Sequence, residues 1–275
     1  MTFIFITDLD GTLLGKHDFN FGIIKSDLTG LLTAGHLLVI ASSKTKIEIE
    51  SFCDELGRRV PYIYENGAGV GNFSLLSGCE APLHSHKNPN AIQTDALLTT
   101  WERHIPLSLR SRCHFIKDMD VDAQKACLGL GATALDRAMK RFFSLPFIFS
   151  GSALEIRNLE YLAALAGLSI QQGGRVFNLS GRHDKADYLP KIREWATMSK
   201  ATPVLIVLGD SKNDIEMLKQ ADVSCIIPDE NGYCLNFGNR NSPTIIAPRP
   251  APLGWLDAVE EALSLFPVKE GVNYG

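Results

Sequence analysis

Residues 3–12 read Phe-Ile-Phe-Ile-Thr-Asp-Leu-Asp-Gly-Thr, an apolar run that ends in two carboxylates and a glycine. Such runs, without polar alternation, are typical of strands buried on both faces of a parallel sheet. Two further runs occur, Leu-Leu-Val-Ile-Ala at 37–41 and Val-Leu-Ile-Val-Leu at 204–208. Polar turns follow them, and then residues 46–56 and 214–220 show the apolar spacing of helices. Strand, polar turn and helix in repetition predict an α/β domain with a parallel, Rossmann-like sheet.

The middle of the chain, residues 82–184, departs from this pattern. Prolines and a stretch rich in His and Asn interrupt it near residues 82–90. Helices are predicted at 91–103, 121–141 (two, split by Gly129-Leu130-Gly131) and 159–166, and short strands at 146–149 and 175–179. We therefore predict a core domain of residues 1–81 and 185–275, closed by a helix at 254–265, with an α+β domain of residues 82–184 inserted into it.

Composition narrows the classes of function. The 275 residues carry a net charge of −4, which gives no reason to expect nucleic acid as a partner. No apolar run reaches the roughly 18 residues that a membrane span needs, so no membrane partner is expected. The N-terminus has no basic segment before its apolar run, and we expect a cytoplasmic protein. The six cysteines are scattered without a CxxC pair, which indicates reduced thiols and argues against a zinc site.

The three predicted strands place polar side chains at one edge of the sheet. Ligands of open parallel sheets bind beyond the carboxyl ends of the strands, so Asp8, Ser42 and Asp210 should converge there. Asp8 and Asp10 face the same way and would repel each other unless a cation lies between them. Oxygen ligands suit Mg²⁺, and Mn²⁺ accepts the same octahedral site. The alternative for this pair is a solvated acidic turn.

Three other polar segments are less specific when taken alone. In Gly209-Asp210-Ser211-Lys212-Asn213-Asp214, the acidic groups lie near a helix start, where simple capping by Asp210 or Asn213 is the alternative. The hydroxyls of Ser42-Ser43-Lys44-Thr45 can cradle a phosphate, although Ser and Thr are also the commonest helix caps. Lys185 opens a predicted helix, where a lysine is usually solvated.

These four segments, in this order, resemble the haloacid dehalogenase-like (HAD) phosphatase superfamily, from Phe3 to about Ile227. The resemblance implies that Asp8 is the nucleophile and that Asp10 is the general acid and base. It also implies that Ser42 and Lys185 are catalytic and that the inserted domain is the C2-type cap of the Cof-type branch. The residues implied for a Mg²⁺ site are Asp8, Asp10, Asp210, Asn213 and Asp214.

A narrower resemblance rests on Ala41-Ser42-Ser43-Lys44-Thr45, Tyr64-Glu65-Asn66-Gly67-Ala68 and Gly254-Trp255. These segments are similar to those of the mannosyl-3-phosphoglycerate phosphatase family, which implies a small anionic phosphorylated sugar as substrate. Two cap positions depart from that pattern, because Leu145 replaces an acidic residue and Asn178 replaces a histidine. The identity of the sugar, mannosyl or glucosyl, therefore stays open.

A phosphoglycerate group carries a carboxylate besides its phosphate, and arginine forks and amide donors suit both anions. Lys140 and the neighbouring Arg141 are weaker candidates, because such a pair on a helix is usually a solvated face. Glu65 and Asn66 lie in a loop that can meet the sugar or the cap, or serve as a structural turn. The candidate substrate-binding residues are Ser43, Lys44, Glu65, Asn66, Lys140, Arg175, Asn178 and Ser180.

Three other functions remain open at this point. A generic Cof-type phosphatase of sugar phosphates or nucleotides would share the core motifs, as would a phosphotransferase similar to phosphomannomutase. A non-catalytic binding module is the third, although it has no need of both Asp8 and Asp10. The sequence leaves the oligomeric state open.

Overall fold

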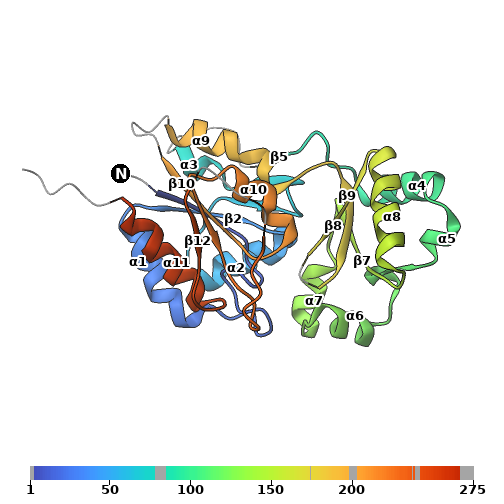
Figure 1. The fold of residues 1–275 in the computed structure, drawn as a ribbon, viewed down its shortest axis with the longest axis horizontal. Helices are drawn as coiled ribbons and strands as arrows, with labels where there is room; N and C mark the ends of the chain where they lie inside the picture. Colours follow the sequence, from blue (N-terminus) through green and yellow to red (C-terminus); the bar gives the residue numbers. More distant parts are fainter. Residues whose placement is uncertain are drawn as a thin grey trace, which may run out of the picture.

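The structure, a computed structural model, contains two separate sheets (Figure 1). It describes residues 3–77, 85–173, 175–197, 203–236, 238 and 242–266. An eight-stranded sheet with the order β12-β11-β10-β1-β2-β3-β4-β5 forms the core domain, and a four-stranded sheet with the order β6-β7-β9-β8 lies in the inserted domain. The predicted α/β architecture with an inserted α+β domain is confirmed.

Strand β1 lies in the middle of the core sheet. It pairs in parallel with β10 on one side and with β2 on the other, so that all three strands end at the same edge. The strands from β12 to β3 are parallel to one another, whereas β4 pairs antiparallel with both β3 and β5. Its strands are β1 (Phe3–Thr7), β2 (Leu37–Ala41), β3 (Tyr62–Tyr64), β4 (Gly69–Gly71), β5 (Ser85–Lys87), β10 (Val204–Gly209), β11 (Val223–Ile226) and β12 (Thr244–Ile246).

Helices cover both faces of this sheet, which explains the continuous apolar runs. Phe3 and Phe5 of β1 pack under α1 (Lys25–Thr33), α2 (Lys46–Leu56) and α11 (Leu253–Ser264). Ile4 and Ile6 point to the opposite face, toward α9 (Leu189–Thr197) and α10 (Ile215–Lys219), with α3 (Ser74–Ser77) beside them. Alternate side chains of one strand therefore enter two separate hydrophobic cores.

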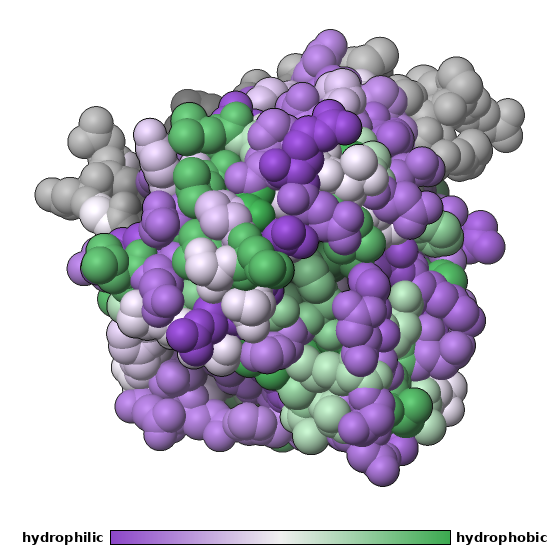
Figure 2. Space-filling model, turned by 90° about the vertical axis from the view of Figure 1, so that its right-hand side faces the viewer, coloured by the Kyte–Doolittle hydropathy of each residue, from purple (hydrophilic) through white to green (hydrophobic). Residues whose placement is uncertain are grey.

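The inserted domain is a four-stranded antiparallel sheet with helices on its outer face (Figure 1). Trp101, Phe147 and Leu159 lie in its own hydrophobic core. Its elements are α4 (Thr94–His104), α5 (Leu107–Arg110), β6 (Cys113–Phe115), α6 (Val121–Leu128), α7 (Ala132–Ala138), β7 (Ser144–Phe149), α8 (Ala153–Leu165), β8 (Leu168–Gln172) and β9 (Phe177–Gly181). The outer face is seen in Figure 2, where apolar groups lie among hydrophilic ones. The opposite face of the sheet looks toward the core domain, where α7 contacts α2 (Figure 1).

Several predicted boundaries shift in the structure. The helix expected at 159–166 begins earlier, at Ala153, because Ser152 and Glu155 form a capping box. The strand expected at 175–179 occupies Phe177–Gly181. Ser85–Lys87, assigned from sequence to the inserted domain, pairs with β4 in the core sheet. The predicted boundary at residue 82 falls within residues 78–84, outside the described part of the chain.

Two further features concern membrane-spanning helices and the cysteines. Among the described residues, no helix combines the length and the apolar character required to cross a membrane. The described cysteines, Cys53, Cys113, Cys127, Cys225 and Cys234, are free thiols.

Helix α11 is fastened beneath β1 by a buried tryptophan. Trp255 is fully buried, and its Nε1 donates to Thr7 Oγ1 at 3.0 Å. Its ring and that of Phe5 pack edge-on, with the ring centres 6.1 Å apart. A side chain at the preceding Gly254 would place a Cβ 1.8 Å from the carbonyl oxygen of Arg249, so the close approach of the helix requires glycine. Thr7 immediately precedes Asp8, and the tryptophan therefore supports the end of the central strand.

We expect Trp255→Ala to lower the free energy of unfolding by about 3–5 kcal/mol, because it leaves a cavity and removes a buried hydrogen bond. Urea unfolding followed by circular dichroism would measure the change. Leu107→Ala is the control: this residue is 70% exposed, and its loss should change the stability by less than about 0.5 kcal/mol. Equal stability of the two variants would contradict the role given to Trp255.

Candidate active site

The carboxyl ends of β1 and β10 bring three aspartates together. Ligand oxygens of Asp8, Asp210 and Asp214 all lie within 4.8 Å of one another. Asp8 directly follows β1, and Asp210 directly follows β10. Ser42 follows β2 at the same edge, where it is buried and its hydroxyl accepts from the Lys44 amide at 3.3 Å. The predicted convergence of Asp8, Ser42 and Asp210 agrees with this arrangement.

Lys185 lies in this cluster, although it is 177 residues from Asp8 in the sequence. It is fully buried, and its Nζ donates to Asp8 Oδ1 at 2.8 Å and to Asp214 Oδ1 at 2.7 Å. Burial alone would lower the pKa of Lys185, but the carboxylates of Asp214 and Asp8 raise it above its ordinary value. The lysine therefore stays charged, and the short 3-10 helix Lys185–Tyr188, capped by Asp184, fixes its position.

The cluster carries more negative than positive charge. Among the described residues, Lys185 is the cation within hydrogen-bond distance of these aspartates, and Lys16 lies 3.9 Å from Asp210. Burial raises the pKa of Asp8 to about 6. Burial, together with Asp214 and Asp8, raises the pKa of Asp210 well above its usual range. A divalent cation among these oxygens would relieve the repulsion, so the residues present fit a hard metal ion.

The turn after β1 packs directly against the turn after β10. Gly11 has a φ of +84°, and a Cβ there would lie 2.8 Å from Asp210 Oδ2. Thr12 donates from Oγ1 to Asp210 Oδ1 at 3.0 Å. Asp214 Oδ2 accepts from the backbone amides of Asp210 and Ser211 at 3.1 and 3.0 Å. These contacts hold the carboxylates in place and explain why a glycine follows Asp10.

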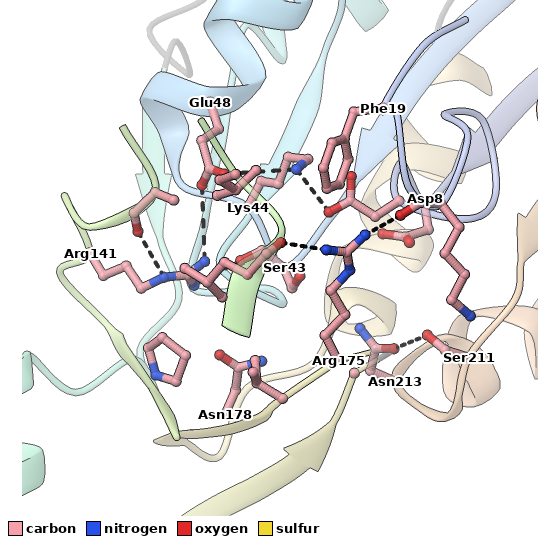
Figure 3. A pocket seen from close by; sticks show the side chains of 18 residues that line it. Asp8, Phe19, Ser43, Lys44, Glu48, Arg141, Arg175, Asn178, Ser211 and Asn213 are labelled. Carbon is pink, nitrogen blue, oxygen red and sulfur yellow. Dashed lines mark hydrogen bonds and ion pairs between the residues drawn. The ribbon is translucent and has the colours of Figure 1, made fainter. Parts of the chain in front are cut away.

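The acidic cluster opens into a pocket between the two domains (Figure 3). Its empty volume is about 770 Å³, including the space open to solvent. Cationic side chains line it from both domains: Lys16 and Lys44 from the core, and Arg141 and Arg175 from the inserted domain. The four cations outnumber the three carboxylates that line the pocket, Asp8, Asp10 and Glu48, and this favours an anionic ligand.

Ser43, Lys44, Arg175 and Asn178, predicted as substrate-binding residues, line this pocket. Lys44 Nζ pairs with Asp10 Oδ2 at 2.8 Å. Arg175 donates to the carbonyl oxygens of Leu128, at 2.7 Å, and Lys16. Both cations lie 5.0 Å from the ring centre of Phe19. Asn178 is buried, and its Oδ1 lacks a hydrogen-bond partner among the described residues.

Two other predicted substrate-binding residues do not line the pocket. Lys140 is half-exposed and pairs with Asp136, four residues earlier, at 2.7 Å, as the alternative of a solvated helix face anticipated. Ser180 is buried in β9, and its hydroxyl donates to the carbonyl oxygen of Gly181 at 3.0 Å. Their positions do not support the substrate contacts expected from sequence.

Glu65 and Asn66 lie beside the pocket rather than in its lining. The Glu65 carboxylate is turned to the inserted domain, where it accepts from the amides of Phe142 and Phe143. Asn66 Oδ1 accepts from Asn213 Nδ2 at 3.1 Å. The sequence left open whether this loop meets the sugar, meets the cap or is a structural turn, and Glu65 meets the cap. Asn213, which was predicted as a metal-binding residue, lines the pocket.

Three residues that line the pocket were not predicted from the sequence: Lys16, Phe19 and Glu48. Phe19 adopts a φ of +54°, a left-handed conformation that is rare for an aromatic residue and cannot be read from the sequence. Glu48 completes a capping box with Thr45 at the start of α2, and that signature, Thr followed three residues later by Glu, was readable.

Comparison with known proteins gives relatives over nearly the whole chain. Residues 5–86 match the haloacid dehalogenase-like hydrolase family. A glucosyl-3-phosphoglycerate/mannosyl-3-phosphoglycerate phosphatase from Persephonella marina is 30% identical over 265 residues, which cover 95% of this chain and 97% of the relative. A protein of the same name from Methanococcoides burtonii is 26% identical over 277 residues, covering 96% and 98% of the two chains.

A solved structure gives the same result for the fold. It is a sugar phosphatase of HAD subclass IIB that aligns with a TM-score of 0.61 at 15% identity, over 96% of this chain and 98% of the other. The core sheet with its inserted antiparallel sheet is thus the Cof-type arrangement expected from the motifs. The chain is a phosphoric monoester hydrolase and belongs to the haloacid dehalogenase-like family that includes the glucosyl-3-phosphoglycerate/mannosyl-3-phosphoglycerate phosphatases.

Proposed function

We propose that this enzyme hydrolyses mannosyl- or glucosyl-3-phosphoglycerate, with Mg²⁺ as cofactor and an aspartyl-phosphate on Asp8 as intermediate. The observation that carries the proposal is the buried array of Asp8, Lys185 and Asp214, from which Asp8 reaches the lining of a pocket that also holds four cationic side chains. The names of the relatives support this substrate class. The products would be mannosylglycerate or glucosylglycerate, together with inorganic phosphate.

In the first step, a carboxylate oxygen of Asp8 bonds to phosphorus while the bond from phosphorus to the glycerate oxygen breaks. Lys185 already holds Oδ1, so we assign the attack to Oδ2. Asp10 gives its proton to the leaving alkoxide. Lys185 and the Ser42 hydroxyl bind phosphoryl oxygens, where they hold negative charge through the transition state.

In the second step, water attacks the phosphorus of the aspartyl-phosphate and frees Asp8, while Asp10 takes a proton from that water. The residues that would hold Mg²⁺ are Asp8, Asp210, Asp214, Asn213 and the backbone carbonyl of Asp10. When bound, the ion neutralises negative charge on the phosphate and lets an anionic carboxylate approach it.

The pocket provides for the remainder of the substrate. A glycerate carboxylate close to the phosphate would meet Lys44, Arg141 and Arg175, which line the same cavity. Asn178 offers a buried Oδ1 without a partner among the described residues, and a sugar hydroxyl would satisfy it. Asn178 is one of the two cap positions that depart from the family pattern, so it is a candidate for sugar selection.

We expect Asp8→Asn to lower kcat by at least roughly a thousandfold, because the amide oxygen is a poor nucleophile. Phosphate release would be measured with Mg²⁺ present, and circular dichroism would check that the fold persists. Asp54→Asn, an exposed position on α2, is the matched control and should keep full activity. Near-normal turnover by Asp8→Asn would reject the nucleophile.

A substrate panel separates the proposal from its alternatives. The two glycosyl-3-phosphoglycerates should give kcat/KM values at least roughly a hundredfold above those of hexose phosphates and pyridoxal phosphate. Similar values for all of them would favour a generic Cof-type phosphatase. Transfer of labelled phosphate to a second sugar instead of to water would favour a phosphotransferase.

Removing the buried lysine tests the metal assignment. Lys185→Met leaves three buried carboxylates uncompensated and should cost about 3–5 kcal/mol of stability without divalent cations. Adding Mg²⁺ should raise the melting temperature more in this variant than in the wild type. Lys219→Met, which removes an exposed ion pair with Glu216, should melt like the wild type. If Mg²⁺ changes no melting temperature, the cation does not bind here.

A further inference from the structure

Glu65 belongs to the core domain, but its carboxylate serves the inserted domain. The residue is 1% exposed. One oxygen accepts from the Phe142 amide at 3.1 Å, and the other accepts from the Phe143 amide at 2.9 Å and the Ser144 hydroxyl at 2.7 Å. We propose that Glu65 is a positioning residue that docks residues 142–144 on the core and thereby holds Arg141 at the pocket. The inference rests on the proposed function in that it names what sets this site for its substrate.

The connection from Glu65 to the pocket is continuous. Ser144 donates its hydroxyl proton to Glu65, and the same oxygen accepts from Arg141 Nη1 at 3.0 Å. Arg141 Nη1 also donates to the carbonyl oxygen of Ser43 at 3.0 Å, in the segment expected to cradle phosphate. The arginine is 12% exposed and lines the pocket. Arg141 Nε also donates to the carbonyl oxygen of Ala138 at 3.1 Å, and Nη2 lies 4.0 Å from Glu48. Ser144 is therefore one of four groups that orient the guanidinium, and it is the one that links Arg141 to Glu65.

The turn that carries Glu65 also contacts the catalytic segments. The Glu65 amide donates to the carbonyl oxygen of Lys44 at 2.9 Å, and the Asn66 amide donates to that of Ser42 at 3.0 Å. His183 Nε2 lies 3.1 Å from the carbonyl oxygen of Glu65, two residues before Lys185. Glu65 and Asn66 have φ angles of +44° and +56°, so the turn adopts a conformation that these contacts must maintain.

The chemistry of the site requires a carboxylate at this position. Three donors converge on the Glu65 side chain, and only a group with two acceptor oxygens can satisfy them all. Glutamine has nearly the same shape but would turn an NH₂ group toward a backbone N–H. A glycosyl-3-phosphoglycerate carries a carboxylate that Arg141 would bind, whereas p-nitrophenyl phosphate carries none, so only the first substrate should depend on the placement of Arg141.

The test uses Glu65→Gln in the full-length enzyme with Mg²⁺. For the glycosyl-3-phosphoglycerate that the wild type hydrolyses best, we expect kcat/KM to fall roughly 10- to 100-fold, mainly through KM, since charge-assisted hydrogen bonds are lost. The decrease for p-nitrophenyl phosphate should be at least roughly tenfold smaller. An equal decrease for both substrates would indicate general damage and would overturn the proposal.

Two further variants complete the kinetic test. Glu50→Gln is the matched control, because Glu50 accepts from Tyr62 within the core at 3.0 Å, and it should behave like the wild type. Ser144→Ala should show the same selective loss as Glu65→Gln. The double variant should lose less than the product of the two single effects, because both residues belong to one chain of bonds. If the loss in the double variant equals the product of the two single effects, Glu65 and Ser144 do not act through one chain of hydrogen bonds.

Hydrogen exchange gives a readout that needs no turnover. The amides of Phe142 and Phe143 donate to Glu65, so both should exchange faster in Glu65→Gln than in the wild type. Equal exchange rates would overturn the docking role. If the wild type hydrolyses no glycosyl-3-phosphoglycerate, the proposed function fails, and the exchange result still decides whether Glu65 docks the inserted domain.

Discussion

Everything in this structure depends on a buried ammonium group placed between two carboxylates. Lys185 binds Asp8 and Asp214 in a space closed to solvent, with Asp210 beside them. Two charges of one sign cannot share such a space without an ion of the other sign. The parallel sheet solves the geometric problem, because β1 and β10 are neighbours that end at one edge and carry Asp8 and Asp210 there.

Both domains contribute charged side chains to the pocket. The core supplies the carboxylates of Asp8 and Asp10 together with Lys16 and Lys44, and the inserted domain supplies Arg141 and Arg175. Both arginines also donate to backbone carbonyls of the core, at Ser43 and Lys16. Each guanidinium therefore contributes to domain contact and to the positive wall of the pocket. This dual use explains how a small number of side chains can both seat the inserted domain and favour an anionic substrate.

Much of the core site could be predicted because its signals are local. An apolar run followed at once by carboxylates fixes both the strand and the side chains at its end, and this held for Asp8 and Asp210. The short strands β3 to β5 were missed, since three residues are too few to carry a periodic signal. Contacts between domains were less readable. Glu65 was expected at the substrate site, but the facing inserted domain binds its carboxylate. Lys140 was expected there as well, but it pairs with the nearby Asp136.

The order of the strands also has a consequence for how the protein is made. Strand β1 is synthesised long before its partner β10, which lies about 200 residues later in the chain. The hydrophobic core of the inserted domain comes from one continuous stretch, residues 92–179, and can form while the core sheet still lacks three of its eight strands, β10, β11 and β12. The aspartate cluster is complete only when residue 214 has been synthesised. The inserted domain can therefore fold before all the residues of the active site are present.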